Sequence, residues 1–210
     1  MYKMPHFTEE EKEATVAFMK AHPFVTLVGT DGLRSAATQV PVLVHEGQDG
    51  LTLRGHIMRN TDHHKAILAI PEVLVLFTGP QCYVSSSWYK ERGTGGTWNY
   101  MTVQARGRLT FDDERGTVEL LSDLTRHFEL GQRQPELVEN MPEEYVNNNV
   151  KAISGFTIAV TELHATFKLS QNKDDETYER IVRELSELND YAANEIADEM
   201  VRRRPGLFTG

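Results

Sequence analysis

The sequence predicts an α+β protein built on a mostly antiparallel β-barrel, with helices inserted between strands and a long helix after them. Short apolar runs alternate with turns that contain Gly or Pro, which is typical of antiparallel strands. Other segments carry apolar residues at spacings of three and four, which indicates amphipathic helices. The chain has 210 residues and no low-complexity tract or Gly/Ser-rich linker, so we expect a single domain over residues 1–210.

The first expected element is a helix that begins at Thr8. The Thr8 hydroxyl and the Glu11 carboxylate have the spacing of a capping box, and His22-Pro23 ends the helix. A turn at Thr30-Asp31-Gly32 then connects the first two strands. Three consecutive antiparallel strands are expected at residues 24–29, 34–45 and 51–57.

The middle of the chain mixes strands with short helices. A helix over residues 60–70 is closed by Pro71, and another follows Asp112-Asp113. A third is expected over residues 141–152. Gly107 indicates a bulge or a break in the longest strand. Further strands are expected at residues 73–77, 82–85, 98–111 and 156–163.

The last expected element is one long amphipathic helix over residues 174–204. Its apolar positions recur at spacings of three and four, and they are Ile181, Leu185, Leu188, Ala192, Ile196 and Met200. This stripe can pack on the same domain or on the equivalent helix of a partner, and the sequence leaves both arrangements open.

The net charge and the cysteine content limit which classes of function are compatible with the sequence. The formal net charge is −9, which opposes tight binding to a nucleic-acid backbone. The basic run at residues 202–204 ends the expected long helix, where cations complement the helix dipole. One cysteine, Cys82, excludes an intramolecular disulfide and suits a reducing compartment. Residues 1–7 lack the apolar core of a secretory signal, and no apolar run has the length of a bilayer span, so we expect a cytoplasmic protein without a membrane segment.

Two aromatic stretches, residues 83–89 and 97–100, contain both tryptophans together with serines and an asparagine. Aromatic rings supply stacking area, and hydroxyls and amides supply directional hydrogen bonds, which is what a planar heteroaromatic ligand requires. A β-hairpin with a half-buried aromatic cluster explains the same composition. Both interpretations are open from residue types alone.

Residues 54–65 leave a strand and enter a helix while carrying Arg, His, Thr and Lys side chains. A helix start with nearby cations favours a phosphate group. The alternative is a solvated turn in which Asp62 caps the helix. Adjacent His63 and His64 point about 100° apart on a helix, so no shared metal site is expected.

A second polar loop, residues 167–173, joins the last strand to the long helix, and an ordinary turn with a cap at Asp174 explains it equally well. Residues 93–96 are Gly-rich but lack the Lys-Ser/Thr helix start of a phosphate-binding loop. No nucleophile elbow, dinucleotide fingerprint or metalloprotease motif occurs in the sequence.

These segments together resemble the PaiB-like, FMN-binding negative transcriptional regulators. The resemblance extends over nearly the whole chain and is most specific at Ser87-Trp88-Tyr89, Thr97-Trp98-Asn99-Tyr100 and residues 167–172. It also includes His22-Pro23-Phe24, Gly55-His56, Phe77-Thr78-Gly79-Pro80, Tyr83-Val84-Ser85 and Ile153-Ser154-Gly155-Phe156. The chain differs from the family pattern at Ser86, at Gly95-Gly96 and at Thr61-Asp62.

The resemblance implies an FMN-binding split β-barrel that forms a homodimer, with the flavin between the subunits. It places His56, Arg59, Thr61 and Lys65 at the phosphate and ribityl end. It places Lys168 and Gln171 where the final loop or the partner reaches the pocket. The residues implied for the pocket wall and its hydrogen bonds are Ser85, Ser87, Trp88, Tyr89, Thr97, Trp98 and Asn99.

Three functions are compatible with the sequence. A flavin-dependent sensor or regulator follows from the resemblance, with direct DNA binding disfavoured by the charge. A flavin-dependent oxidoreductase using FMN with NAD(P)H is the alternative, because the cofactor itself carries the redox chemistry. A barrel without cofactor that binds a partner through its last helix is the third.

Overall fold

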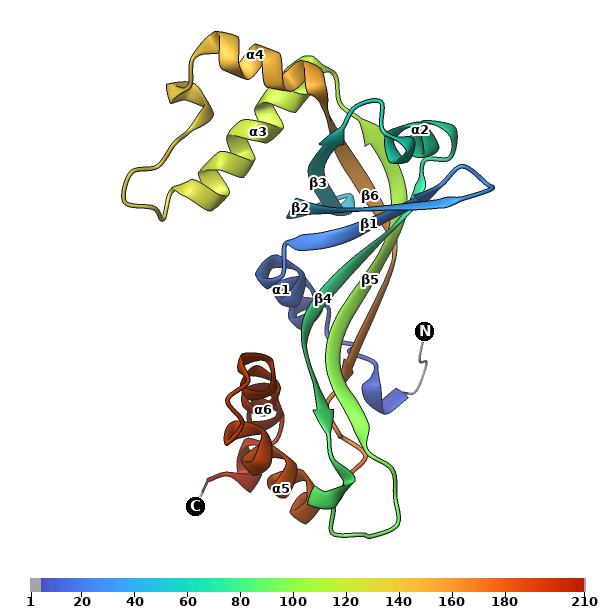
Figure 1. Cartoon of the computed structure of the whole chain (residues 1–210), viewed down its shortest axis with the longest axis vertical. Helices are drawn as coiled ribbons and strands as arrows, with labels where there is room; N and C mark the ends of the chain where they lie inside the picture. Colours follow the sequence, from blue (N-terminus) through green and yellow to red (C-terminus); the bar gives the residue numbers. More distant parts are fainter. Residues whose placement is uncertain (1–4, 210) are drawn as a thin grey trace. The chain divides into compact units, whose positions relative to one another are not determined.

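The structure is a computed structural model, and it describes residues 5–209. In this part of the chain, six strands form a closed barrel in the order β1-β2-β3-β6-β5-β4 (Figure 1). The β1–β2, β1–β4, β2–β3 and β3–β6 pairs are antiparallel. Within residues 5–209, six α-helices precede, interrupt and follow the strands. The predicted α+β class with an antiparallel barrel is therefore confirmed.

The first three strands are β1 (Phe24–Thr30), β2 (Ser35–Gly47) and β3 (Gly50–Met58), close to the predicted ranges. Asp31 closes the β1–β2 turn, because its Oδ1 accepts from the backbone N–H groups of Leu33 at 2.8 Å and Arg34 at 2.7 Å. Gly32 has φ +91°, a conformation that glycine adopts without strain. The sequence-predicted turn is confirmed.

The remaining strands are longer than the apolar runs suggested. β4 (Glu72–Val84) joins the two short strands predicted at residues 73–77 and 82–85. β5 spans Thr97–Phe111 and β6 spans Ile153–Lys168. β5 continues through Gly107 without a break, and a Cβ there would lie 2.2 Å from the Ala159 carbonyl oxygen. Glycine at this position lets the backbones of β5 and β6 approach closely.

The inserted helices match their predicted places. They are α2 (Asp62–Ala69), α3 (Glu114–Glu129) and α4 (Glu143–Ala152), and α3 and α4 lie side by side (Figure 1). Asp113 caps α3 by accepting from the Gly116 N–H at 2.8 Å.

The first helix, α1 (Lys12–Ala21), begins four residues later than predicted. Thr8 forms a β-bridge with Thr166, and its N–H donates to the Pro5 carbonyl at 3.2 Å, so it does not start the helix. The Glu9 carboxylate accepts from the Glu11 N–H at 3.0 Å instead. The capping-box prediction at Thr8 is therefore wrong.

The predicted single helix over residues 174–204 is two helices, α5 (Asp175–Ser186) and α6 (Tyr191–Arg203). Asp190 starts α6 by accepting from the N–H groups of Ala192 and Ala193 at 2.9 and 3.2 Å. The Asn194 amide donates to the Leu185 carbonyl at 3.2 Å and so caps the end of α5. Hydrogen bonds from local side chains to the backbone thus interrupt the helix, although the spacing of the apolar residues alone predicts one continuous helix.

Four of the six residues of the predicted apolar stripe are buried within unit 1. Ile181, Leu185, Ile196 and Met200 have no exposed surface, and α5 packs against α6. Leu188, between the two helices, is 41% exposed, so the predicted stripe is covered except near the break between α5 and α6.

The chain divides into two compact units. Unit 1 contains Met1–Phe18, Thr78–Val103 and His164–Gly210, and unit 2 contains Met19–Phe77 and Gln104–Leu163. The expectation of one domain stays a prediction. Residues 1–4, which the signal-peptide argument used, lie outside the described residues. Within residues 5–209, no helix is long and apolar enough to cross a membrane.

Candidate functional site

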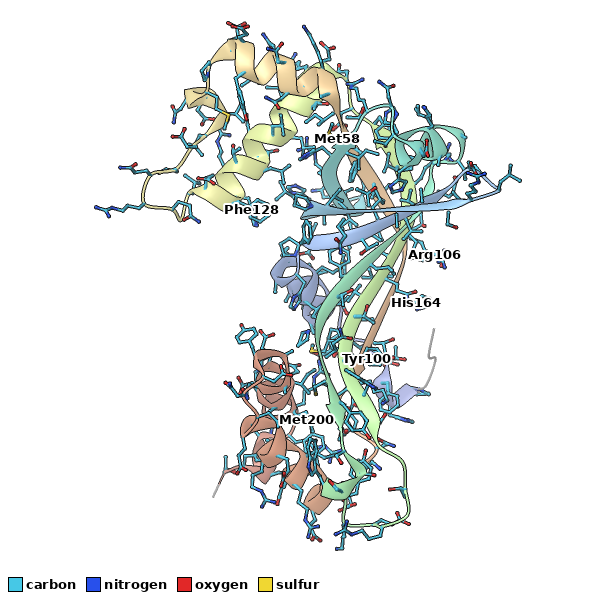
Figure 2. The ribbon with its side chains drawn as sticks, in the orientation of Figure 1. Met58, Tyr100, Arg106, Phe128, His164 and Met200 are labelled. Carbon is cyan, nitrogen blue, oxygen red and sulfur yellow. The ribbon has the colours of Figure 1, made fainter. Side chains whose placement is uncertain are left out.

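The start of α2 follows directly from the end of β3, which Met58 marks in Figure 2. Asn60 turns the chain with φ +62°, and Thr61 caps the helix. The Thr61 hydroxyl accepts from the His64 N–H at 3.1 Å and donates to the Met58 carbonyl at 3.2 Å. Its hydrogen bonds therefore hold the turn that presents the helix N-terminus.

Two cations flank this turn. The Arg59 N–H donates to the Ala152 carbonyl at 2.8 Å, and its guanidinium Nε donates to the Ile153 carbonyl, a bond that does not use the two Nη atoms. Lys65 is exposed on the first turn of α2. The exposed carboxylate of Asp62 is the opposing charge on the same turn. We call Arg59, Thr61 and Lys65 the α2 start.

Burial disfavours the protonated form of three histidines around the α2 start. Burial lowers the pKa of His56, His63 and His64, and Arg59 lowers that of His64 further. His63 Nδ1 shares a hydrogen bond of 2.7 Å with the Thr38 hydroxyl, and His64 Nε2 one of 3.1 Å with the Ser154 hydroxyl. The buried atoms His56 Nδ1, His63 Nε2 and His64 Nδ1 have no partner among the described residues. The positive charge here therefore resides on Arg59 and Lys65.

In unit 1, Asn99 on β5 belongs to a buried polar cluster. Asn99 is fully buried, and its Oδ1 accepts from the Ser170 hydroxyl at 3.0 Å. Its amide nitrogen donates to the sulfur of Met200, which Figure 2 labels on α6, at 3.5 Å. Ser170 itself adopts φ +60°, so this bond fixes an unusual backbone turn.

Lys168 and Gln171 complete this cluster. The Lys168 amine donates to the Thr97 hydroxyl and, at 2.6 Å, to the Trp98 carbonyl. Burial, and then the positive charge of Lys173, lowers the pKa of Lys168. The Gln171 side chain accepts from the Leu169 N–H at 2.7 Å and donates to the Phe167 carbonyl. We call Thr97, Asn99, Lys168, Ser170 and Gln171 the β5–β6 polar cluster.

The aromatic residues of unit 1 differ in exposure. Tyr89 is 2% exposed, and the Lys173 amine lies 3.8 Å from the centre of its ring. Trp88 is half-buried on the short 3₁₀ turn Ser86–Trp88, where the Ser85 hydroxyl accepts from the Ser87 N–H at 3.2 Å. Trp98 is 54% exposed.

Tyr83 was not among the site residues predicted from the sequence, but its ring lies against that of Trp98. Tyr83 is 51% exposed, and the two ring centroids lie 6.0 Å apart at an interplanar angle of 65°. Cys82 and Val84 on either side are buried, so strand alternation directs Tyr83 outward. The alternation of Cys82, Tyr83 and Val84 along the strand could have predicted from the sequence that Tyr83 is exposed.

The predicted site residues thus fall into two sets. His56, Arg59, Thr61 and Lys65 belong to unit 2, and the others belong to unit 1. The serine, tryptophan and tyrosine side chains of residues 83–89 share unit 1 with the β5–β6 polar cluster. A flavin role for either set stays a prediction.

Comparison with known proteins identifies the family. Residues 1–162 match the family described as "Putative FMN-binding domain". The chain belongs to this family. It is 28% identical over 200 residues to the protease synthase and sporulation protein PAI 2 of Bacillus subtilis, covering 95% of this chain and 96% of that protein. An uncharacterized protein of Aspergillus fumigatus is 34% identical over 157 residues, covering 57% of this chain and 60% of that protein.

Solved structures show the same fold at low sequence identity. The flavocytochrome Anf3 from Azotobacter vinelandii has a TM-score of 0.59 and 14% identity, covering 80% of this chain and 72% of its own. The FAD and heme binding protein from Mycobacterium smegmatis has a TM-score of 0.54 and 12% identity, covering 77% and 73%. Together with the observed topology, they confirm the predicted split-barrel fold.

The residues present fit a flavin mononucleotide by their chemistry. The α2 start offers a lysine amine, guanidinium nitrogens and a helix N-terminus, which together suit a phosphate. The exposed rings of Trp98 and Tyr83 offer apolar faces to a planar ring system. The exposed Asp62 carboxylate on the same turn reduces the net attraction for a phosphate.

Proposed function

We propose that this protein binds FMN and acts as a flavin-dependent sensor or regulator. The observation that carries FMN binding is the α2 start, where Arg59 and Lys65 accompany a capped helix N-terminus in a chain of this family, and the regulator role rests on the family resemblance. Cations at a helix N-terminus bind a phosphate through charge-assisted hydrogen bonds. Lys65 supplies its exposed amine, and Arg59 supplies the nitrogens that its bond to Ile153 leaves unused.

We propose separately that the flavin ring contacts the exposed aromatic residues of unit 1. Trp98 and Tyr83 provide the stacking surface, and Trp88 and the Ser85 and Ser87 hydroxyls line it. The β5–β6 polar cluster then holds Trp98 from behind, since Lys168 donates to the Trp98 carbonyl at 2.6 Å. In this proposal Asn99, Lys168 and Gln171 position the wall rather than contact the ring.

We propose FMN rather than FAD as the ligand, because the family description names FMN. The similar solved structures include an FAD and heme binding protein, so both flavins belong in the test. The homodimer with the flavin between subunits rests on the family resemblance, and light scattering at micromolar concentration measures it. A mass of one chain would contradict the dimer.

The proposed regulator does not contact DNA directly. The basic run at residues 202–204 is engaged within unit 1. Arg203 binds the carboxylates of Glu9 and Glu199, and Arg204 binds Asp175. Arg202 pairs with Glu199 at 2.7 Å. With a net charge of −9, the regulator would act through another protein or a small effector in the cytoplasm.

The alternative is an FMN-dependent oxidoreductase. Bound FMN supplies redox chemistry itself, so the protein needs only to hold and orient it. The similarity in fold to a flavocytochrome is compatible with this alternative.

Absorbance spectroscopy tests the proposal. Purified protein titrated with FMN and, separately, with FAD is expected to show a shifted flavin spectrum with FMN and a weaker response to FAD. Slow or absent bleaching by NAD(P)H supports the sensor, and rapid bleaching supports the oxidoreductase. No uptake of either flavin would contradict both.

A further inference from the structure

Two adjacent histidines on the first turn of α2 bind to strands on opposite sides of β3. His63 Nδ1 shares a hydrogen bond of 2.7 Å with the hydroxyl of Thr38 on β2. His64 Nε2 shares one of 3.1 Å with the hydroxyl of Ser154 on β6. β2 and β6 are the two neighbours of β3 in the barrel, and α2 follows β3 in the chain. The two imidazoles, which we call the histidine clasp, therefore tie the helix to both strands that flank β3.

The second nitrogen of each ring in the clasp is buried. His63 is 5% exposed, and its Nε2 has no hydrogen-bond partner among residues 5–209. This atom lies against β1 at Gly29, where an added Cβ would come within 3.1 Å of it. His64 Nδ1 is also buried without a partner in that range, and its ring packs against Phe111 with the centroids 4.7 Å apart.

This arrangement fits neutral histidines. A neutral imidazole has one N–H donor, which the Thr38 or Ser154 hydroxyl can accept, whereas an imidazolium has two donors and a positive charge. A proton on either ring would therefore leave a charged donor buried without an acceptor, which costs more than an unfilled neutral acceptor.

The charges around the clasp do not compensate such a proton. The titratable cations and histidine on α2 and on the segments next to it are Arg34, His56, Arg59 and Lys65. The acids there are Asp31, Asp62 and Asp112. Asp31 accepts from two backbone N–H groups of its own turn, Asp62 is exposed, and Asp112 Oδ2 faces Gly155. Within residues 5–209, the bonds of the two rings go to hydroxyls and not to these carboxylates.

The sign of the pH dependence follows from the same contacts. Burial lowers the pKa of both His63 and His64 from the ordinary value of 6.5, and Arg59 lowers that of His64 further. Detachment of α2 would expose the rings and let them take up protons at their ordinary pKa. The clasp is therefore complete above about pH 6.5 and is lost as pH falls below it. Each ring can change the equilibrium for detachment by up to about tenfold per pH unit in this range.

We propose that the histidine clasp is an acid-sensitive latch, which holds α2 on the barrel at neutral pH and releases the helix when His63 and His64 take up protons. The latch itself requires no ligand. The same helix carries Thr61 and Lys65, so its release would also remove the phosphate contacts of the flavin site, and this consequence rests on the proposed function.

Hydrogen exchange of the full chain without flavin tests the latch, so that its failure and a failure of FMN binding are distinguishable. Exchange is followed by mass spectrometry between about pH 5 and 8 and corrected for the intrinsic rate at each pH. We expect the protection of α2 (Asp62–Ala69) to fall by about tenfold or more between about pH 7 and 5.5. The protection of β3 (Gly50–Met58) should change by less than about threefold.

A double variant assigns the effect to the clasp. His63→Gln/His64→Gln keeps an amide for the Thr38 and Ser154 hydroxyls but cannot titrate, so it should remove most of the fall in α2 protection. His45→Gln is the matched control, because His45 is exposed on β2, and it should behave like the wild type. A double variant that loses α2 protection on acidification as the wild type does would overturn the latch.

NMR titration of the imidazoles in the wild-type protein makes the test independent of the folding of any variant. We expect His63 and His64 to take up protons below pH 6.5, in the same range in which α2 loses protection. Titration of both rings at the ordinary value with α2 still protected at about pH 5 would overturn the latch. Equal loss of protection in α2 and β3 would also overturn it, because that result describes unfolding of the whole barrel.

Discussion

The β5–β6 polar cluster and the α2 start contain similar residue types, yet their side chains have different partners. In the cluster, Asn99 and Ser170 bond to each other in the interior, and the Lys168 amine donates to two groups of its own chain. At the α2 start, Lys65 is exposed, and the bond of Arg59 to Ile153 leaves its Nη atoms unused. Polar residues in a motif therefore mark a ligand contact only where their hydrogen-bonding groups are not already engaged within the protein.

This difference predicts that substitutions in the cluster affect folding, whereas those at the α2 start affect ligand affinity.

Asn99→Ala should give the largest loss of stability. It removes the acceptor of the buried Ser170 hydroxyl and leaves a cavity, which together cost about 2–4 kcal/mol. Urea denaturation measures the change. The double variant Asn99→Ala/Ser170→Ala should lose less than the sum of the two single variants, because both remove the same bond. Additive losses would show that the two residues act separately.

Tyr178 should make stability depend on alkaline pH. Its hydroxyl donates to the Met200 carbonyl at 3.0 Å, and burial raises its pKa from 10.0 to about 12. The unfolded chain loses this proton first, so the contribution is complete below pH 10 and is lost as pH rises toward 12. The expected decline is about 1.4 kcal/mol per pH unit in this window.

Denaturation of the wild type and of Tyr178→Phe between pH 9 and 12 isolates this contribution. The difference in free energy of unfolding between the two proteins should shrink as pH rises. A constant difference across the window would mean that Tyr178 does not retain its proton in the folded protein.

Trp98→Ala should have a smaller effect, confined to flavin binding. Trp98 is 54% exposed, so stability should change little. Loss of a stacking ring, worth about 1 kcal/mol, should weaken FMN and riboflavin equally, by about fivefold. Fluorescence titration with both flavins measures this. A large fall in stability would instead assign Trp98 to the scaffold, together with Asn99.

The sequence predicted the fold well where periodicity and turn chemistry agree. The first three strands and the α2, α3 and α4 helices lie within a few residues of their expected bounds. The errors arose where local capping competes with periodicity. At the break between α5 and α6, the spacing of Leu188 and Ala192 continues the helical stripe, but the bonds of Asp190 and Asn194 end one helix and start another.

The candidate site was less predictable, because its division depends on contacts between residues far apart in the chain. Asn99 and Ser170 are separated by 71 positions, and nothing local shows that they bond. The sequence marked both as polar residues in loops or strands that resemble the family. The α2 start was easier to predict from the sequence, since Thr61, which caps the helix, and Lys65 are close together in the chain.

The most direct test of the account compares FMN with riboflavin, which lacks the phosphate, in the Lys65→Ala variant. Lys65 is exposed and alanine favours helix, so the fold should be unchanged. Leu68→Ala, at an exposed position on the same helix, is the control. At Arg59 a lysine substitution is preferable to alanine, because the Arg59 side chain also donates to the Ile153 carbonyl.

The account predicts that Lys65→Ala weakens FMN by about ten- to a hundredfold, leaves riboflavin affinity within about twofold, and leaves the free energy of unfolding unchanged. Unchanged FMN affinity, or equal loss of both flavins, would show that the α2 start is an ordinary solvated turn and would contradict the phosphate assignment.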